Sequence, residues 1–279
     1  MNSARALQSM KDYKEQFDIF ICGGSPHVHL LLPLLNKLRP YGRVHLVSSF
    51  LSAADLHQLA GLYDILIEPR HSDDGYRNFE LFCIRDINRL ATAPYFIKLD
   101  ADVQLQPDWI EFVEECITAH PDAVLFGSRR GNNLIDFTLS GELVRQVLET
   151  EVRISNALKV GGGFYAGKTS FFKKHLRVMD VIHEFMWCFK DGVRFRPHLN
   201  PEYWPAAGEE SEEPITLIGQ SKNFEGNEDT LRSLVVHAMG AGDRLHVIDS
   251  HGRVQVVRTN TMNPDAIVRQ SETQTRQSL

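Results

Sequence analysis

Short apolar segments alternate with longer amphipathic segments along the first half of the chain. The apolar segments are short enough for buried strands and cover residues 17–22, 43–47, 64–67, 95–99 and 123–127. The amphipathic segments have the spacing of helices and cover residues 30–38, 52–62, 79–90 and a stretch beginning at Pro107. Strands that alternate with helices favour a parallel sheet with helices on both faces, so the pattern predicts an α/β fold.

The regular alternation fades after residue 127. Residues 134–154 are mixed in character, and three consecutive glycines follow at 161–163. Residues 245–249 and 254–257 are strand-like, and the turn residues between them predict a small C-terminal β-hairpin.

Composition and charge narrow the class of protein. With 43% hydrophobic and 24% charged residues, the chain is globular, and its net charge of -6 disfavours a nucleic-acid-binding protein. The four cysteines are far apart without a CxxC pair, which favours buried thiols in a reducing compartment. No apolar run approaches the length of about 18 residues that spans a membrane. We expect a cytoplasmic protein without a transmembrane segment, and a peripheral membrane contact stays open.

Two aspartates follow the apolar segment at 95–99. Asp100 and Asp102 are separated by one residue, so in an extended chain both side chains project to the same side. They stand at the carboxyl end of a predicted strand, where open α/β sheets bind ligands. Two carboxylates there suit Mg²⁺ or Mn²⁺, with further positions for water and phosphate oxygens. The alternative interpretation is a helix-capping turn with incidental acids.

Two later segments also carry candidate chemistry. Glu228 and Asp229 begin a predicted helix, where acids also complement the helix dipole. His237 would lie about 12 Å further along an unbroken helix, so it reaches the same metal only if the helix breaks or the chain folds back. Three glycines at 161–163 permit close approach to the backbone, either by a ligand or in a tight packing turn.

Together these segments resemble the GT-A-fold, nucleotide-sugar-dependent glycosyltransferases, in a family-2-like form. The resemblance spans about residues 17–240. It rests on residues 17–24, 85–102, 161–163 and Asn227-Glu228-Asp229 with His237 downstream. It implies a Rossmann-like, mostly parallel sheet flanked by helices. It also implies an enzyme that moves a sugar from a nucleotide-sugar donor, with UDP favoured, to an acceptor hydroxyl.

The resemblance assigns roles to individual residues. Asp100 and Asp102 would bind Mn²⁺ or Mg²⁺ bridging the diphosphate, with His237 as a further metal ligand. Asp229 would be the general base of an inverting displacement, with Glu228 as the alternative. Residues expected around the nucleotide and metal are Cys22, Gly23, Gly24, Arg77, Arg85, Asp100, Ala101 and Asp102. Residues expected to shape the donor-sugar and acceptor pocket are Gly161, Gly162, Gly163 and Phe164.

The resemblance also implies a domain organisation. One glycosyltransferase domain covers residues 17–258, with a nucleotide-binding half at 17–127 and an acceptor-binding half at 128–258. An N-terminal extension (1–16) precedes it, and a polar, flexible tail (259–279) follows. The chain departs from the family at the turn Gly23-Gly24-Ser25 and has no acid after the second strand, which leaves the nucleotide base open.

Two functions of other classes are alternatives. A haloacid-dehalogenase-type phosphohydrolase also places Asp-x-Asp after an apolar strand, but it requires a second acidic pair after a later strand. A non-catalytic nucleotide-sugar-binding domain would keep the acids for metal binding alone, and a turnover assay separates it from an enzyme. The sequence leaves open whether the mechanism inverts or retains. It also leaves open whether the acceptor is a glycan, a lipid-linked sugar or a small molecule.

Overall fold

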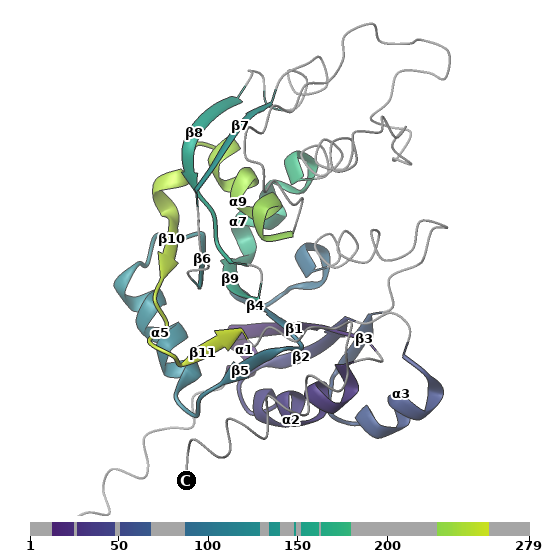
Figure 1. Ribbon diagram of the computed structural model, residues 1–279. Coiled ribbons are helices and arrows are strands. Elements are labelled where there is room, and N and C mark those ends of the chain that lie inside the picture. The colour runs from purple at the N-terminus through teal and green to yellow at the C-terminus, as the bar shows by residue number, and fades with distance from the viewer. Residues whose placement is uncertain are drawn as a thin grey trace, which may run out of the picture.

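Seven strands form one mixed sheet in the order β10-β6-β9-β4-β1-β2-β3 (Figure 1). The computed structural model describes residues 13–24, 27–47, 51–67, 87–128, 134–139, 148, 152–161, 163–179 and 228–256. The sheet strands are β1 (Phe17–Cys22), β2 (Arg43–Val47), β3 (Ile65–Ile67), β4 (Tyr95–Asp100), β6 (Leu125–Ser128), β9 (Phe164–Lys168) and β10 (Leu245–Ile248). The helices are α1 (Tyr13–Gln16), α2 (Val28–Leu38), α3 (Ala53–Leu59), α5 (Trp109–Ala119), α7 (Thr169–Lys174), α9 (Glu228–Ala238) and the short 3₁₀ helix η3 (Gly242–Arg244).

Most strand pairs in this sheet are parallel. β1 pairs in parallel with β2 and β4, β2 pairs in parallel with β3, and β6 pairs in parallel with β10. β9 runs antiparallel between β4 and β6. The mostly parallel, Rossmann-like sheet flanked by helices that the sequence predicts is therefore confirmed.

Two hydrophobic cores lie on opposite faces of the sheet because side chains alternate along each strand. Ile97 and Leu99 of β4 belong to the core beneath α2, α3 and α5. Phe96 of β4 and Tyr165 of β9 belong to the core beneath α7 and α9. Figure 1 shows α2 and α3 on one side of β1–β3 and the α7–α9 pair on the other side.

The predicted C-terminal hairpin is wrong, although both of its strands exist. β10 pairs in parallel with β6, whereas β11 (Val254–Val256) pairs antiparallel with β5 (Val103–Leu105). The turn residues between the two strands favoured a local pairing, but each strand finds a distant partner. The mixed segment after residue 127 contains an antiparallel pair, β7 (Leu134–Leu139) with β8 (Val152–Leu158).

Two further expectations concern the thiols and the membrane. Cys22 and Cys116 are free and buried, as predicted, whereas Cys83 and Cys188 lie outside the described residues. Among the helices that the structure describes, none combines the length and hydropathy needed to cross a bilayer.

A buried carboxylate ties the first strands of the sheet together. Asp18 in β1 accepts hydrogen bonds from His45 Nε2 (3.0 Å) and the Ala93 amide (2.8 Å), and pairs with Arg43 Nε (2.9 Å). Burial by itself raises the pKa of Asp18. The hydrogen bonds from His45, Ala93 and Thr92 outweigh burial and lower that pKa to about 2.

This lowered pKa predicts how stability depends on pH. Because Asp18 has a lower pKa in the folded protein than its ordinary 3.8, its contribution is complete above that value and is lost as pH falls towards 2. We expect Asp18→Asn to lower the free energy of unfolding by about 2 kcal/mol at pH 7 and by less at pH 3. Urea unfolding at both pH values measures this. The same loss at both pH values would contradict it.

Candidate functional site

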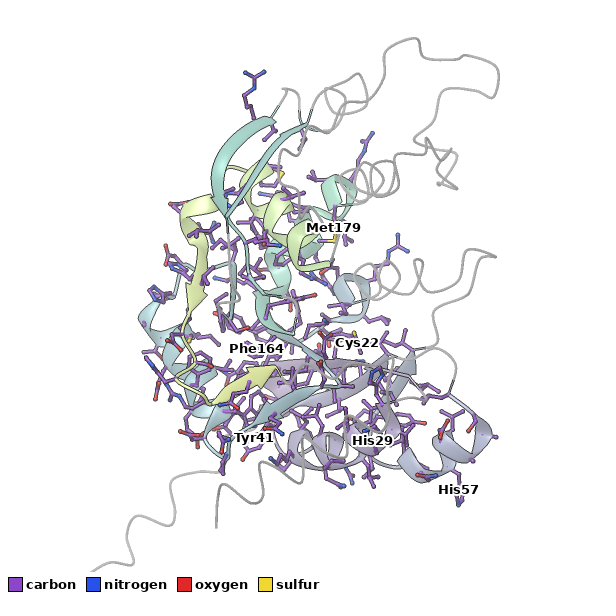
Figure 2. All side chains as sticks on the ribbon, viewed as in Figure 1. Cys22, His29, Tyr41, His57, Phe164 and Met179 are labelled. Atoms are coloured by element: carbon purple, nitrogen blue, oxygen red, sulfur yellow. The ribbon has the colours of Figure 1, made fainter. Side chains whose placement is uncertain are left out.

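Three of the predicted motifs meet at the carboxyl edge of the sheet. The amide of Asp100 donates to the Gly163 carbonyl (2.9 Å), and the amide of Ala101 donates to the Cys22 carbonyl (3.0 Å). In Figure 2, the labels of Cys22 and Phe164 mark β1 and β9, the two strands that flank β4. The end of β1, the aspartate turn and the glycine turn thus form one continuous edge, at the end of the sheet where open α/β folds bind ligands.

Gly23 brings the end of β1 against the aspartate turn. Its amide donates to the Val47 carbonyl (3.1 Å), which fixes the turn on β2. A Cβ at this position would lie 2.9 Å from the Ala101 Cβ and 3.1 Å from the nearest Leu31 methyl. These approaches leave no space for a side chain, so glycine is required by the packing of β1, β4 and α2.

We therefore expect Gly23→Ala to displace the turn that carries Asp100 and Asp102. The crowding is expected to lower the free energy of unfolding by about 1–3 kcal/mol, the range typical of overpacked cores. Urea unfolding of the variant beside wild type measures the loss. An unchanged midpoint and slope would show that the contact relaxes without cost.

Asp100 projects from the end of β4 with 35% of its side chain exposed, and it is paired with a buried lysine. Lys98 lies two residues earlier on the same face, is 2% exposed, and forms a salt bridge from Nζ to Asp100 Oδ1. Burial opposes the charge of Lys98, but the Asp100 carboxylate outweighs it and raises the pKa of Lys98 above its ordinary value. The ammonium therefore remains charged and holds one oxygen of Asp100.

Asp102 occupies the turn between β4 and β5 and is half-buried. β5 and β11 pair directly after it, with Val103 opposite Val256, so the turn is held on both sides. Two carboxylates within three residues at this edge fit the donor set of Mg²⁺ or Mn²⁺. In the described part of the chain, no group of three His, Cys, Asp or Glu side chains could hold a metal. Water and phosphate oxygens suit the remaining positions around such an ion.

His27 is a residue at this edge that the sequence analysis missed. It directly precedes α2, and its amide donates to the Gly24 carbonyl (2.8 Å). Its Nδ1 is buried and has no hydrogen-bond partner in the described structure. Burial, followed by His29, lowers the pKa of His27, while the Asp100 charge opposes that shift, which places His27 within electrostatic range of Asp100. Its position directly after the glycine turn of β1 was the signal in the sequence.

Glu228 and Asp229 form the first turn of α9, as predicted, and their side chains lie outside the described part. The next turn anchors the helix near the glycine turn, because the Val160 amide donates to Ser233 Oγ (3.2 Å). Val160 immediately precedes Gly161, whose amide donates to the Ser128 carbonyl (3.0 Å). The structure therefore brings α9 beside the glycine segment.

Among the described residues, His237 does not form a metal-binding group with Asp100 and Asp102, so the structure gives no support to its predicted role as a metal ligand. α9 runs unbroken from Glu228 to Ala238, so neither the break nor the fold-back that this role requires occurs. His237 Nε2 donates to the Leu158 carbonyl (2.8 Å), and its ring packs on Gly242, where a Cβ would lie 2.4 Å from Nδ1. The ring is thus occupied in joining α9 to β8 and η3.

Of the remaining predicted site residues, one is buried and the others lie outside the described part of the chain. Phe164 is fully buried, and its ring packs against Phe112 with centroids 6.3 Å apart, so it supports the edge from the α5 side. Because the Phe164 side chain is fully buried, it is not available to line the donor-sugar and acceptor pocket that the sequence predicts. Arg77, Arg85 and Gly162 lie outside the described residues.

Comparisons with known proteins identify distant likenesses in solved structures alone. No family model and no curated protein sequence matches the chain. The galactosyltransferase LgtC, solved with donor and acceptor sugar analogs, is 13% identical with a TM-score of 0.38; the match covers 59% of this chain and 62% of LgtC. This chain thus matches less than two thirds of LgtC's length.

Two further solved structures are about as distantly similar to this chain. Glucosyl-3-phosphoglycerate synthase from Mycobacterium tuberculosis, solved with Mn²⁺, UDP-glucose and phosphoglyceric acid, is 10% identical with a TM-score of 0.38, over 58% of this chain and 61% of that chain. CMP:2-keto-3-deoxy-manno-octonic acid synthetase, solved with CTP, is 10% identical with a TM-score of 0.46, over 95% of this chain and 100% of that chain. At scores below 0.5 these likenesses are too distant to assign a function, which has to come from the residues of the sheet edge.

Proposed function

We propose that the protein is a metal-dependent glycosyltransferase that moves a sugar from a UDP-sugar to an acceptor hydroxyl with inversion. The observation that carries this proposal is the meeting of the Asp100–Asp102 turn with the Cys22–Gly24 turn and Gly163 at one sheet edge. The edge combines hard carboxylate ligands with backbone that a diphosphate can approach closely. That combination is what transfer from a nucleoside diphosphate requires.

Asp102, together with the outer oxygen of Asp100, would hold Mn²⁺ or Mg²⁺. When bound, the ion supplies positive charge that offsets the charge developing on the departing diphosphate. The buried Lys98 pairs with the other oxygen of Asp100, which fixes the orientation of this carboxylate at the edge of the sheet. Asp102 lies in the turn itself and is the more direct ligand.

The donor would lie over the Cys22–Gly24 turn. Gly23 packs closely on Ala101, so the turn at the end of β1 lies directly against the turn that carries Asp100 and Asp102. His27 adds a polar ring within electrostatic range of Asp100. Arg77 and Arg85 remain candidates for the pyrophosphate, and Gly161–Gly163 for the donor sugar and acceptor.

Asp229 would take the proton from the acceptor hydroxyl, with Glu228 as the alternative base. The support is positional: α9 lies on the same face of the sheet as Lys98 and Tyr165, the face towards which Asp100 also alternates. The proposed domain covers residues 17–258, with donor binding in 17–127 and acceptor binding in 128–258. The buried free thiols Cys22 and Cys116 support a cytoplasmic location.

A thermal-shift panel tests the proposal without knowledge of the acceptor. UDP, GDP, CDP and their common sugar conjugates are each added with and without Mn²⁺. A ligand that binds the native state alone raises the melting temperature according to its concentration and affinity. We expect a shift with UDP and UDP-sugars that requires Mn²⁺. A shift with GDP in place of UDP would change the donor, and no shift with any nucleotide would contradict the proposal.

A further inference from the structure

A buried series of contacts leads from Asp100 into the core beneath α9. Lys98 Nζ pairs with Asp100 Oδ1 and lies 5.7 Å from the centre of the Tyr165 ring, within the range of a cation–π interaction. Lys98 and Tyr165 are direct partners in the β4–β9 register. Both side chains are buried, so the contact is shielded from water and salt. The metal-site carboxylate is thus connected to β9.

Arg232 continues this series into α9. Its side chain is fully buried, and Nε donates to Tyr165 Oη at 2.7 Å. Nη1 donates to Asn88 Oδ1 at 2.7 Å. The guanidinium carbon also lies 4.6 Å from the Phe96 ring centre and 5.3 Å from that of Phe172. Hydrogen bonds in the guanidinium plane and aromatic rings around it fix the orientation of Arg232.

This arrangement exceeds what packing alone requires. Burying a charged side chain is costly unless it is paired and hydrogen-bonded, and apolar residues of similar volume often stabilise a core equally well. The chain nevertheless buries Lys98 and Arg232 around one tyrosine, next to the proposed metal site. A function in orientation explains the cost better than one in stability.

Because Arg232 lies close to Asp229 in α9, fixing the orientation of Arg232 also fixes the first turn of this helix. Arg232 follows Asp229 by three residues, about 4.5 Å along the helix axis. Over one turn a helix is rigid, so fixing Arg232 on Tyr165 also fixes the backbone of the first turn. Ser233 adds a second attachment through the Val160 amide. The first turn of α9 is therefore held relative to β9, and β9 to Asp100.

We propose that Tyr165 and Arg232 are positioning residues. They hold the first turn of α9, which carries Asp229, in a fixed position relative to the Asp100–Asp102 turn. The proposal rests on the proposed function, because it takes Asp229 as the base. A base displaced by about 1 Å can lose about 100-fold in rate, so small shifts of α9 would be visible in turnover. Neither residue touches the reacting atoms, and both act through α9.

Tyr165→Phe tests this, because it removes the Oη acceptor and keeps the ring. The assay measures UDP release in Mn²⁺ from the donor that wild type hydrolyses fastest among UDP-glucose, UDP-galactose and UDP-N-acetylglucosamine. We expect kcat to fall about 10- to 100-fold, with unchanged KM for the donor and unchanged Mn²⁺ affinity. Arg232→Lys, which keeps the charge but loses the planar fork, is expected to lower kcat in the same way.

Val113→Ala in α5 is the matched control, since Val113 is fully buried in the core on the opposite face. It is expected to lose stability with no change in kcat below its melting temperature. Hydrogen exchange without metal or donor gives a second readout, in which Tyr165→Phe accelerates exchange in α9 and leaves α5 unchanged.

Three results would overturn the inference. Unchanged kcat in both Tyr165→Phe and Arg232→Lys would do so, as would unchanged exchange in α9. An equal loss of kcat in Val113→Ala would show that the loss in Tyr165→Phe and Arg232→Lys results from lower stability and not from positioning. An inactive wild type is a different outcome: it would remove the proposed function, and with it the catalytic consequence of this positioning.

Discussion

Asp102→Ala is expected to abolish metal-dependent turnover while the protein stays folded. Asp102 lies in a half-buried turn at the carboxyl edge of the sheet and is the more direct of the two proposed metal ligands. Without it, the charge that develops on the leaving diphosphate loses its compensation. The loss of such a group lowers turnover by about 10³-fold. UDP release from the preferred UDP-sugar at saturating Mn²⁺ measures the effect, and urea unfolding checks the fold.

Asp108→Ala is the matched control for this prediction. Asp108 is an aspartate in the next turn, beyond β5; it is exposed, and its side chain makes no capping hydrogen bond to α5. It is expected to keep wild-type turnover and metal dependence. Wild-type turnover in Asp102→Ala would remove the metal site from this edge, whereas a loss in both variants would indicate a general effect of charge.

Asp229→Asn is expected to lower kcat by about 10²- to 10⁴-fold, the usual contribution of a general base. The amide is close in size to the carboxylate but cannot accept the proton of the acceptor hydroxyl. Donor binding takes place at the Asp100–Asp102 turn, so the KM for the UDP-sugar is expected to stay unchanged. Steady-state kinetics with the donor varied separate the two parameters.

Glu228→Gln is the comparison that assigns the base. The two acids are neighbours in the first turn of α9, so both substitutions change the charge there equally. If Asp229 is the base, Glu228→Gln keeps most of its turnover, and the reverse result would move the base to Glu228. Wild-type turnover in both variants would favour a retaining mechanism, in which no such base is needed.

The strands of the first half could be predicted because each is a short apolar run between polar segments. β2 has the predicted bounds, and β4 extends the predicted segment by one residue. β9 was missed because Phe164–Lys168 follows the glycines without a pattern of its own, although it runs antiparallel between β6 and β4 in the sheet. The prediction of a C-terminal hairpin was wrong for a related reason. Turn residues indicate pairing between neighbouring strands, whereas β10 and β11 pair with strands that are distant along the chain.

The site was predictable where chemistry coincides with strand ends. Asp100 lies at the carboxyl edge of the sheet, where the sequence placed it, and the glycine turn joins it there because β9 starts beside the end of β4. Lys98 was missed, although a lysine in an apolar strand two residues before an aspartate must share its face. The role of Arg232 depends on Tyr165 and Asn88, 67 and 144 residues away along the chain. No local pattern in the sequence reports such a contact.

Mn²⁺ binding in the presence of UDP tests the central claim most directly, because it needs neither the donor sugar nor the acceptor. Electron paramagnetic resonance records the signal of free Mn²⁺ as wild-type protein is added, with and without UDP, and Asp102→Ala serves as the comparison. We expect wild type with UDP to remove the free signal and Asp102→Ala to leave it. Equal binding by both proteins, or no binding by wild type with UDP, would contradict a metal–diphosphate site at this edge.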